Sequence, residues 1–223
     1  MAIDGPAGAG KSTVARELAR RLGFIYIDTG AMYRAVALWA LRAGVSDADH
    51  HKLEQLALQS EVRFEPGGST IYLNGEDVTT DIRTPEVSSM ASRVSAVAGV
   101  RRILVEKQRA LGSEISVVME GRDIGSVVFP EAQVKVFLDA PARVRAERRV
   151  NELKDRGAEA DAHVTAREIA ERDGRDRSRT EAPLVQSADA VYMDSGDMAP
   201  DDVVEAILKL VRERTANGKE YKR

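Results

Sequence analysis

Short apolar runs and longer segments with helical spacing alternate along this chain. In residues 11–22 apolar side chains recur every three or four positions, and Gly23 follows, which predicts a helix that ends at that glycine. Residues 24–27 predict a buried strand, and a helix over about 31–43 follows, for which Thr29 is a suitable cap. Alternation of this kind predicts an α/β fold with a parallel sheet.

The same reasoning assigns the remaining elements. Further strands are predicted at 115–119, 134–138 and 190–193, and further helices at 47–59, 85–98, 100–111, 141–155, 165–176 and 200–215. Two short β-like runs with a turn at 66–69 between them, followed by Asn74-Gly75, predict a small antiparallel hairpin that interrupts the alternation. The arginine-rich helices on either side of the polar stretch 157–161 are typical of a mobile lid.

Length and composition restrict the class of protein. A chain of 223 residues that is 43% apolar can bury a full core in one α/β domain. Its 33 basic and 36 acidic residues nearly balance, and its few aromatic residues form no stacking platform, which argues against a nucleic-acid-binding surface. The absence of cysteine excludes disulfides and thiolate metal sites, and the three histidines lack the spacing of metal ligands.

The chain contains no apolar run of membrane-spanning length and no basic leader, so we expect a cytoplasmic protein that does not enter a membrane. Only Met1, Ala2 and Ile3 precede a glycine-rich loop, where a strand of about five residues is usual. We therefore expect the start of the chain to have been trimmed.

The glycine-rich loop carries the most specific signal. Its sequence GPAGAGKS fits G-x-x-x-x-G-K-[ST] and lies between an apolar segment and an amphipathic helix. Its backbone N–H groups can surround phosphates, Lys11 can reach the β and γ oxygens of a nucleotide, and Ser12 can ligate Mg²⁺. The residues expected to bind ATP in this loop are Gly5, Pro6, Ala7, Gly8, Ala9, Gly10, Lys11, Ser12 and Thr13. Kinases, GTPases, motors and nucleotide sensors share such a loop, but the lack of an Asn-Lys-x-Asp motif and the short chain favour a small-molecule kinase.

Two polar clusters follow predicted strands and should meet at the carboxyl edge of the sheet, where open α/β sheets bind ligands. The first is DTGAMYR, in which Arg34 can grip an acceptor phosphate and Asp28 can accept from a sugar hydroxyl. The second is EGRDIG, in which Arg122 suits a phosphate and Asp123 can read an exocyclic amine. Plain alternatives remain: an N-cap at Asp28-Thr29, a solvated Arg34 and a local Arg122–Asp123 ion pair.

A third cluster, RDGRDRSR, is rich in arginine. Arg172 and Arg179 lie about two helical turns apart on one face, a spacing that can cover a triphosphate and its acceptor. Phosphoryl transfer depends on positioning and on neutralising charge, so arginines suffice and no general base is needed. The alternative interpretation of such a charge run is a solvated helix face.

Taken together, these motifs resemble those of bacterial cytidylate kinases, a family within the nucleoside monophosphate (NMP) kinases. The resemblance runs nearly end to end and is carried by IDGPAGAGKST, DTGAMYR, LNGEDVTTDIRTPEV, EGRDIGSVVFP and ERDGRDRSRTEAPL. It implies an α/β P-loop kinase with a five-stranded parallel sheet flanked by helices, a small β-hairpin insert in the NMP-binding region and a short helical lid. It further implies one domain over 1–223, with a core at 1–45, 99–142 and 185–215, the insert at about 46–98 and the lid at about 143–184.

The resemblance also implies substrates and roles. The substrates would be ATP, with Mg²⁺, and CMP or dCMP, and the protein would be a monomer. Arg34 and Arg122 would bind the CMP phosphate, Ser92, Arg101 and Asp123 would approach cytosine, Arg172 and Asp176 would bind the ribose, Arg179 would join the phosphate clamp, and Arg148 would close over ATP. The rest of the acceptor site would comprise Asp28, Thr29, Gly30 and Tyr33, and the catalytic groups would be Lys11, Arg122, Arg172 and Arg179.

One position departs from the pattern, because Glu120 stands where an aspartate is common in the family, which keeps the charge and lengthens the side chain by one methylene. Two alternatives stay open at this point. The chain could phosphorylate another small acceptor, such as UMP, dTMP or shikimate, or it could be a regulator that binds a nucleotide without turnover.

Overall fold

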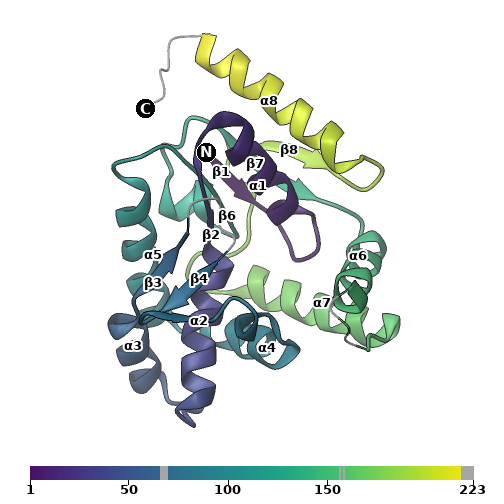
Figure 1. Ribbon diagram of the computed structural model, residues 1–223. Coiled ribbons are helices and arrows are strands. Elements are labelled where there is room, and N and C mark those ends of the chain that lie inside the picture. Colours follow the sequence, from purple (N-terminus) through teal and green to yellow (C-terminus); the bar gives the residue numbers. More distant parts are fainter. Residues whose placement is uncertain (66–69, 156, 158, 217–223) are drawn as a thin grey trace.

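A five-stranded parallel sheet forms the centre of the protein in a computed structural model that describes residues 1–65, 70–155, 157 and 159–216 (Figure 1). The strands stand in the order β2-β6-β1-β7-β8 and all neighbours run parallel. Their bounds are β1 (Ala2–Asp4), β2 (Ile25–Asp28), β6 (Val117–Gly121), β7 (Lys135–Asp139) and β8 (Val191–Asp194). The predicted parallel α/β sheet is therefore confirmed.

Side chains of successive strand residues point to opposite faces of this sheet, and helices cover both faces. Ile3 and Val118 belong to a core beneath α1 (Lys11–Leu22) and α8 (Pro200–Ala216). Their chain neighbours Ala2 and Met119 belong to a second core, which α5 (Ala98–Gly112) and a π-helical turn at Ile124–Val128 cover. Because both faces are buried, the inner strands β1, β6 and β7 are buried almost continuously, whereas burial alternates along the edge strand β8.

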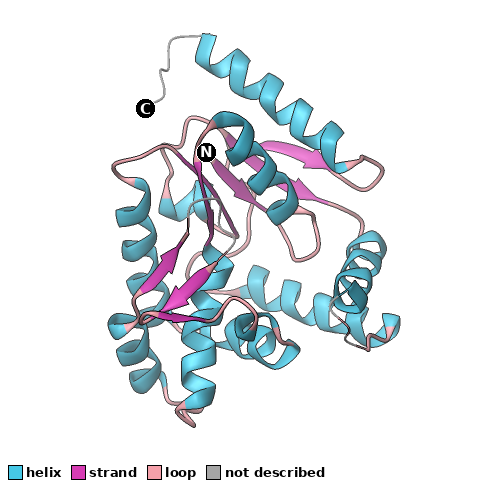
Figure 2. Ribbon diagram, in the orientation of Figure 1, coloured by secondary structure: helices cyan, strands magenta, loops and turns pink. Residues whose placement is uncertain are grey.

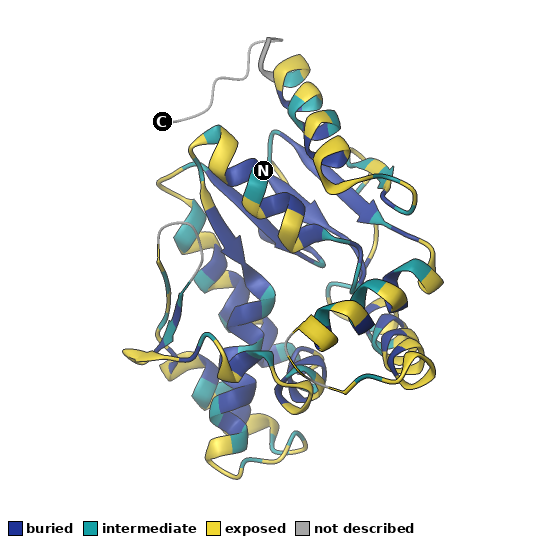
Figure 3. Ribbon diagram, turned by 45° about the vertical axis from the view of Figure 1, so that its right-hand side comes forward, coloured by how far each residue is buried: buried dark blue, intermediate teal, exposed yellow. Residues whose placement is uncertain are grey.

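A third core surrounds α2 (Thr29–Arg42), which is apolar on nearly every side and is drawn mostly as buried in Figure 3. It is enclosed by α3 (His50–Gln59), α4 (Pro85–Val94), the 3₁₀ turn Asp81–Arg83 and a small antiparallel sheet of β3 (Val62–Phe64), β4 (Ile71–Leu73) and β5 (Glu76–Asp77). The predicted hairpin is thus present with a third strand added. Asn74 and Gly75 both have positive φ, 52° and 88°, and return the chain as β5.

The two arginine-rich helices are α6 (Ala142–Asp155) and α7 (Ala162–Ser178), which pack on each other beside the carboxyl edge of the central sheet (Figure 2). Helix α7 begins earlier than predicted, because the Asp161 side chain accepts a hydrogen bond from the Val164 N–H at 2.9 Å and caps the helix there. No helix in the described ranges is long and apolar enough to cross a membrane.

Several predicted boundaries are wrong for local reasons. The cap of α2 is Asp28, whose carboxylate accepts from the Ala31 N–H at 3.0 Å, while the Thr29 hydroxyl donates to the Glu120 carbonyl at 2.7 Å. Helix α3 begins three residues later than predicted, because Asp49 caps it. Strand β6 runs to Gly121, two residues further than predicted, and α4 ends at Val94. The turn predicted at 66–69 lies outside the described residues.

Candidate active site

The phosphate loop leaves β1 and leads into α1. A Cβ on Gly5 would lie 1.9 Å from the Leu138 carbonyl oxygen, so only glycine lets the loop pack this closely on β7. Gly10 occupies the N-cap position of α1 and has no side chain to cover the first N–H groups of the helix. These groups, with the helix dipole, can therefore receive an anion, which fits the predicted role of the loop.

Lys11 starts α1 and is buried, and its Nζ donates a hydrogen bond to the Pro6 carbonyl at 2.7 Å. Burial, aided by the positive charge of Arg122, lowers the pKa of Lys11 to about 7. A nucleotide phosphate beside Nζ would reverse this effect by stabilising the charged ammonium. Lys11 is thus held within the loop, where a bound phosphate would raise its pKa and favour the protonated ammonium.

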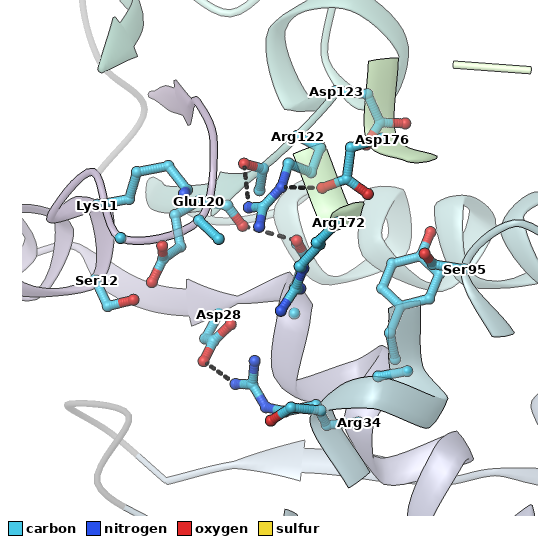
Figure 4. Close-up of a pocket in the computed structure, with 18 of the residues that line it drawn as sticks. Lys11, Ser12, Asp28, Arg34, Ser95, Glu120, Arg122, Asp123, Arg172 and Asp176 are labelled. Atoms are coloured by element: carbon cyan, nitrogen blue, oxygen red, sulfur yellow. Dashed lines mark hydrogen bonds and ion pairs between the residues drawn. The ribbon is translucent and has the colours of Figure 1, made fainter. Parts of the chain in front are cut away.

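Glu120, at the end of β6, lies beside Lys11 and Ser12 on the floor of the site (Figure 4). Its carboxylate accepts a hydrogen bond from the Tyr26 hydroxyl, and burial, together with the nearby charge of Asp28, raises its pKa. The Ser12 hydroxyl and the Glu120 carboxylate line the same cavity, and both offer the oxygen ligands that Mg²⁺ prefers. Ser12, the predicted metal ligand, and Glu120 therefore fit a magnesium ion.

Asp28 and Arg34 face each other across the first turn of α2 (Figure 4). Arg34 Nη2 donates to Asp28 Oδ2 at 2.6 Å, and both side chains line the cavity that adjoins the phosphate loop. Although burial alone would raise the pKa of Asp28, the charges of Arg34 and Arg83 lower it. The capping and substrate-binding interpretations of Asp28 are therefore compatible, since one oxygen caps α2 while the other holds the arginine.

A carboxylate on α7 joins the second and third predicted clusters. Arg122 Nε donates to Asp176 Oδ2 at 2.8 Å, and Arg179 Nη2 donates to Asp176 Oδ1. Although burial alone would raise the pKa of Asp176, these two arginines lower it to about 2. Arg172, one turn before Asp176, points into the same cavity, and burial, with the charge of Arg122, lowers its pKa to about 9. Four arginines from three segments thus meet around one space: Arg34, Arg122, Arg172 and Arg179.

The back of this cavity carries a buried ion pair. Arg101 on α5 donates to the Asp123 carboxylate, and its guanidinium stands 5.7 Å from the centre of the Tyr33 ring. Within the described part of the chain, the Tyr33 hydroxyl and the Nε groups of Arg34, Arg101 and Arg172 are buried without a hydrogen-bond partner. Buried donors of this kind suit a ligand that brings acceptors, such as phosphate oxygens.

Most of the predicted substrate-binding residues therefore line one cavity: Asp28, Thr29, Gly30, Tyr33, Arg34, Arg101, Arg122, Asp123, Arg172, Asp176 and Arg179. Ser92 does not. Its hydroxyl accepts from Arg175 Nε at 3.1 Å and lines a neighbouring cavity between α4 and α7. Ser95 of the same segment lines the first cavity, and Ser88 lines both. We name the first one the acceptor cavity, after the residues predicted to bind the acceptor, and the one on the far side of the phosphate loop the donor-side cavity.

Arg148 lies on the other side of the phosphate loop. Its Nη2 donates to the Ser195 carbonyl at 2.6 Å, and it lines a cavity with residues 8–14 of the loop and the start of α8. Arg148 thus lies next to the phosphate loop and does not line the acceptor cavity, and its contact with ATP stays a prediction. Gly8 lines both cavities, so they meet at the phosphate loop.

Some residues of the site were missed by reasoning from the sequence. Arg149 and Glu152 line both the acceptor cavity and the donor-side cavity, joined by a 2.8 Å hydrogen bond, and Arg83 lines the acceptor cavity from its 3₁₀ turn. Arg149 directly follows Arg148 in the sequence. The two differ only in where their side chains point from α6, and Arg149 alone lines the acceptor cavity as well. Arg83 has a signal in the motif DIRTPEV, which carried the family resemblance but no chemical assignment.

Among families of known proteins, the family model described as cytidylate kinase matches residues 1–213 of this chain. The chain belongs to the cytidylate kinase family. It is 58% identical to a cytidylate kinase of Solibacter usitatus, covering 99% of this chain and 95% of that protein, and 50% identical to a cytidylate kinase of Syntrophotalea carbinolica, covering 96% and 92%. A crystal structure of an uncharacterized protein from Eubacterium ventriosum shares the fold, with a TM-score of 0.53 at 13% identity over 94% of this chain and 96% of that one.

Membership of the cytidylate kinase family explains why the clusters converge. The match covers the phosphate loop, both strand-end motifs and the arginine-rich helix α7, so each predicted motif lies inside it. The predicted resemblance is therefore confirmed, and the protein is an ATP-dependent nucleoside monophosphate kinase.

Proposed function

We propose that this protein transfers the γ-phosphoryl group of ATP to CMP or dCMP and so forms CDP or dCDP. The observation that carries the proposal is one cavity with the phosphate loop at one end and the Arg101–Asp123 pair at the other, lined between them by arginines. The full-length relatives named cytidylate kinase support the same conclusion. Nothing in the comparisons favours a different acceptor or a regulator without turnover.

The basic residues of the site would bind different phosphate groups. Lys11 and the N–H groups of the loop would hold the β and γ phosphates of ATP, and Arg34 and Arg122 would hold the acceptor phosphate. Arg172 and Arg179 line the same cavity and would neutralise the negative charge that spreads over the transferred phosphoryl group. The protein would therefore act by holding two anions in line and neutralising them, which needs no general base.

The acceptor end would read the base and the sugar. Cytosine presents an amino group and a ring-nitrogen acceptor, which match the carboxylate of Asp123 and the guanidinium of Arg101, whereas uracil presents a carbonyl and an N–H there. Asp176 lies near enough to Arg122 and Arg179 to orient both while accepting from a ribose hydroxyl. Tyr33 would form the wall beside the base.

Mg²⁺ belongs to the proposal as the partner of ATP. Ser12 and Glu120 would hold it, because both side chains lie near Lys11 at the phosphate loop and line the same cavity. The ion would supply neutralisation of the β and γ phosphate oxygens. The sequence around Glu120 carries no metal-binding signature beyond the carboxylate itself.

The division of the chain is likewise a proposal. We assign about 46–98 to an acceptor-binding insert and about 143–184 to a lid, because α4 and α7 border the cavities from these two segments. We also propose a monomer that works in the cytoplasm, where its free nucleotide substrates would be found. Sedimentation of the purified protein and localisation of a tagged copy would test these two points.

The direct test is ADP formation from Mg²⁺–ATP with CMP, dCMP, UMP, dTMP and shikimate supplied one at a time, beside an acceptor-free control. We expect turnover with CMP and dCMP to exceed that with the others, and we expect Lys11→Met to abolish it. Preferred turnover with another acceptor would retain the kinase and refute the base assignment. Absence of turnover with every acceptor would refute the proposed transfer itself.

A further inference from the structure

Arg145 of α6 is buried and ties three separate parts of the protein together, although neither the family motifs nor the proposed chemistry assigns it a role. Its Nε donates to the Ala140 carbonyl at 2.9 Å, and its Nη1 donates to the Ala7 carbonyl of the phosphate loop at 3.1 Å. The same Nη1 donates to Asp173 Oδ2 on α7 at 2.6 Å. One guanidinium thus links the end of β7, the phosphate loop and the second lid helix.

The contact between α6 and the phosphate loop is close. Gly8 has a φ of +78°, and a Cβ at that position would lie 2.7 Å from the Arg145 carbonyl oxygen and 3.0 Å from the Arg145 Cβ. The backbone of α6 at Arg145 therefore rests directly on the loop that would hold the ATP phosphates. The proposed lid segment therefore contacts the proposed ATP-binding loop directly at Gly8 and Arg145.

Asp173 connects this contact to the acceptor side. It is buried, and its Oδ1 makes no hydrogen bond within the described residues, so Arg145 is the hydrogen-bond partner of its carboxylate. The preceding residue, Arg172, points into the acceptor cavity, and Asp176, one turn later, binds Arg122 and Arg179. Two carboxylates one turn apart thus fix α7, Asp173 on the donor side and Asp176 on the acceptor side.

We propose that Arg145 and Asp173 form a positioning pair that sets Arg172 against the reacting phosphates by fastening α7 to the phosphate loop. Neither residue lines the acceptor or donor-side cavity in the described part of the chain, so both act through other groups. A displacement of about 1 Å in a group that stabilises the transition state can lower a rate on the order of 100-fold. Loss of the pair should therefore reduce kcat more than it changes substrate binding.

This inference rests on the proposed kinase function, so wild-type turnover with CMP is measured first; its absence would refute that function and, with it, the role of the pair in positioning Arg172 for the transfer. The variants are Asp173→Asn, Arg145→Lys and the double variant, and the control is Glu147→Gln. Glu147 forms an exposed pair with Arg143 on the same helix, at 3.7 Å, and lines neither cavity. Melting temperatures with bound nucleotides establish which variants are folded at the assay temperature.

We expect each single variant to lower kcat by about 10- to 100-fold, with KM for ATP and CMP within about threefold of wild type, and the control to be unchanged. Because both changes break one pair, the double variant should be no more than about threefold slower than the worse single variant. Losses that multiply, losses confined to KM, or unchanged kcat would overturn the proposal. If Asp173→Asn does not fold, Arg145→Lys decides by the same criterion of kcat against KM.

Discussion

Asp123 accepts a hydrogen bond from Arg101, and both side chains are buried at the back of the acceptor cavity, with 7% and 4% of their surfaces exposed. In a pair buried this deeply, loss of one partner leaves the other as an uncompensated buried charge, which strongly destabilises the fold. The pair also places an acceptor and a donor side by side at the depth where a nucleobase would lie. Its position therefore suggests selection of the base rather than a role in stability alone.

Replacing Asp123 by Asn should weaken the choice between bases, because the amide presents an N–H as well as a carbonyl and so tolerates uracil. A mismatched buried polar group costs about 1–3 kcal/mol, so the ratio of kcat/KM for CMP over UMP should fall roughly tenfold. Both kcat/KM values are measured on the same preparation. Asp47→Asn, which breaks the half-exposed Arg93–Asp47 pair, is the matched control and should keep the wild-type ratio. An unchanged ratio in Asp123→Asn would remove Asp123 from base selection.

The pKa of Lys11, about 7 in this structure, predicts that ATP binding weakens as the pH rises. Above its pKa the free lysine is mostly neutral, whereas bound phosphates favour the ammonium, so binding must take up a proton. Affinity is then full below about pH 7 and falls by at most tenfold for each further pH unit. Between about pH 7 and about pH 8.5 we expect the Kd for ATP to rise roughly tenfold, with proton uptake measured by calorimetry in two buffers. Lys11→Arg should flatten the profile, and a flat wild-type profile would contradict the lowered pKa.

Glu120 should control the requirement for magnesium. Glu120→Gln keeps the shape of the side chain and removes the charge next to Ser12, so we expect the Mg²⁺ concentration for half-maximal activity to rise by about 10-fold or more. Glu120→Asp, which keeps the charge and shortens the reach by one methylene, should stay much closer to wild type. The measurement is a magnesium titration at saturating ATP and CMP. Equal magnesium curves for wild type and Glu120→Gln would show that Glu120 does not serve the ion.

The features that could be predicted from the sequence are those whose functional residues lie within one short segment of the chain. The phosphate loop is one continuous segment, so its glycines and Lys11 were identified without knowledge of packing. Asp28, Arg34, Arg122 and Asp123 follow predicted strands, and the parallel sheet brings strand ends to one edge. The order of the strands did not need to be known for that argument to hold.

What could not be predicted depends on how helices pack. Ser92 and Ser95 lie in one segment, and only its packing against α7 turns Ser92 toward Arg175 and Ser95 into the acceptor cavity. Asp28 and Thr29 can both cap a helix, and the choice falls to Asp28 because the Glu120 carbonyl engages the Thr29 hydroxyl. A sequence alone contains no signal for either contact.

Two glycines with similar backbone angles provide a last prediction, which separates backbone strain from steric fit. Gly8 and Gly23 have φ of +78° and +67°, so alanine should cost about 1 kcal/mol of stability at either site through the left-handed conformation. A Cβ at Gly23 meets nothing within 4 Å, whereas at Gly8 it would lie 2.7 Å from the Arg145 carbonyl oxygen, a backbone atom that cannot turn aside.

Gly8→Ala must therefore push α6 away from the phosphate loop or distort the loop itself. We expect Gly23→Ala to lose about 1 kcal/mol in chemical denaturation and to keep its activity, and Gly8→Ala to lose kcat by about 100-fold or more. Both variants are compared by denaturation and by CMP-dependent ADP release. If Gly8→Ala were as active as Gly23→Ala, the close contact between α6 and the phosphate loop would not govern catalysis, because the added methyl group would have been accommodated without consequence for the reacting groups.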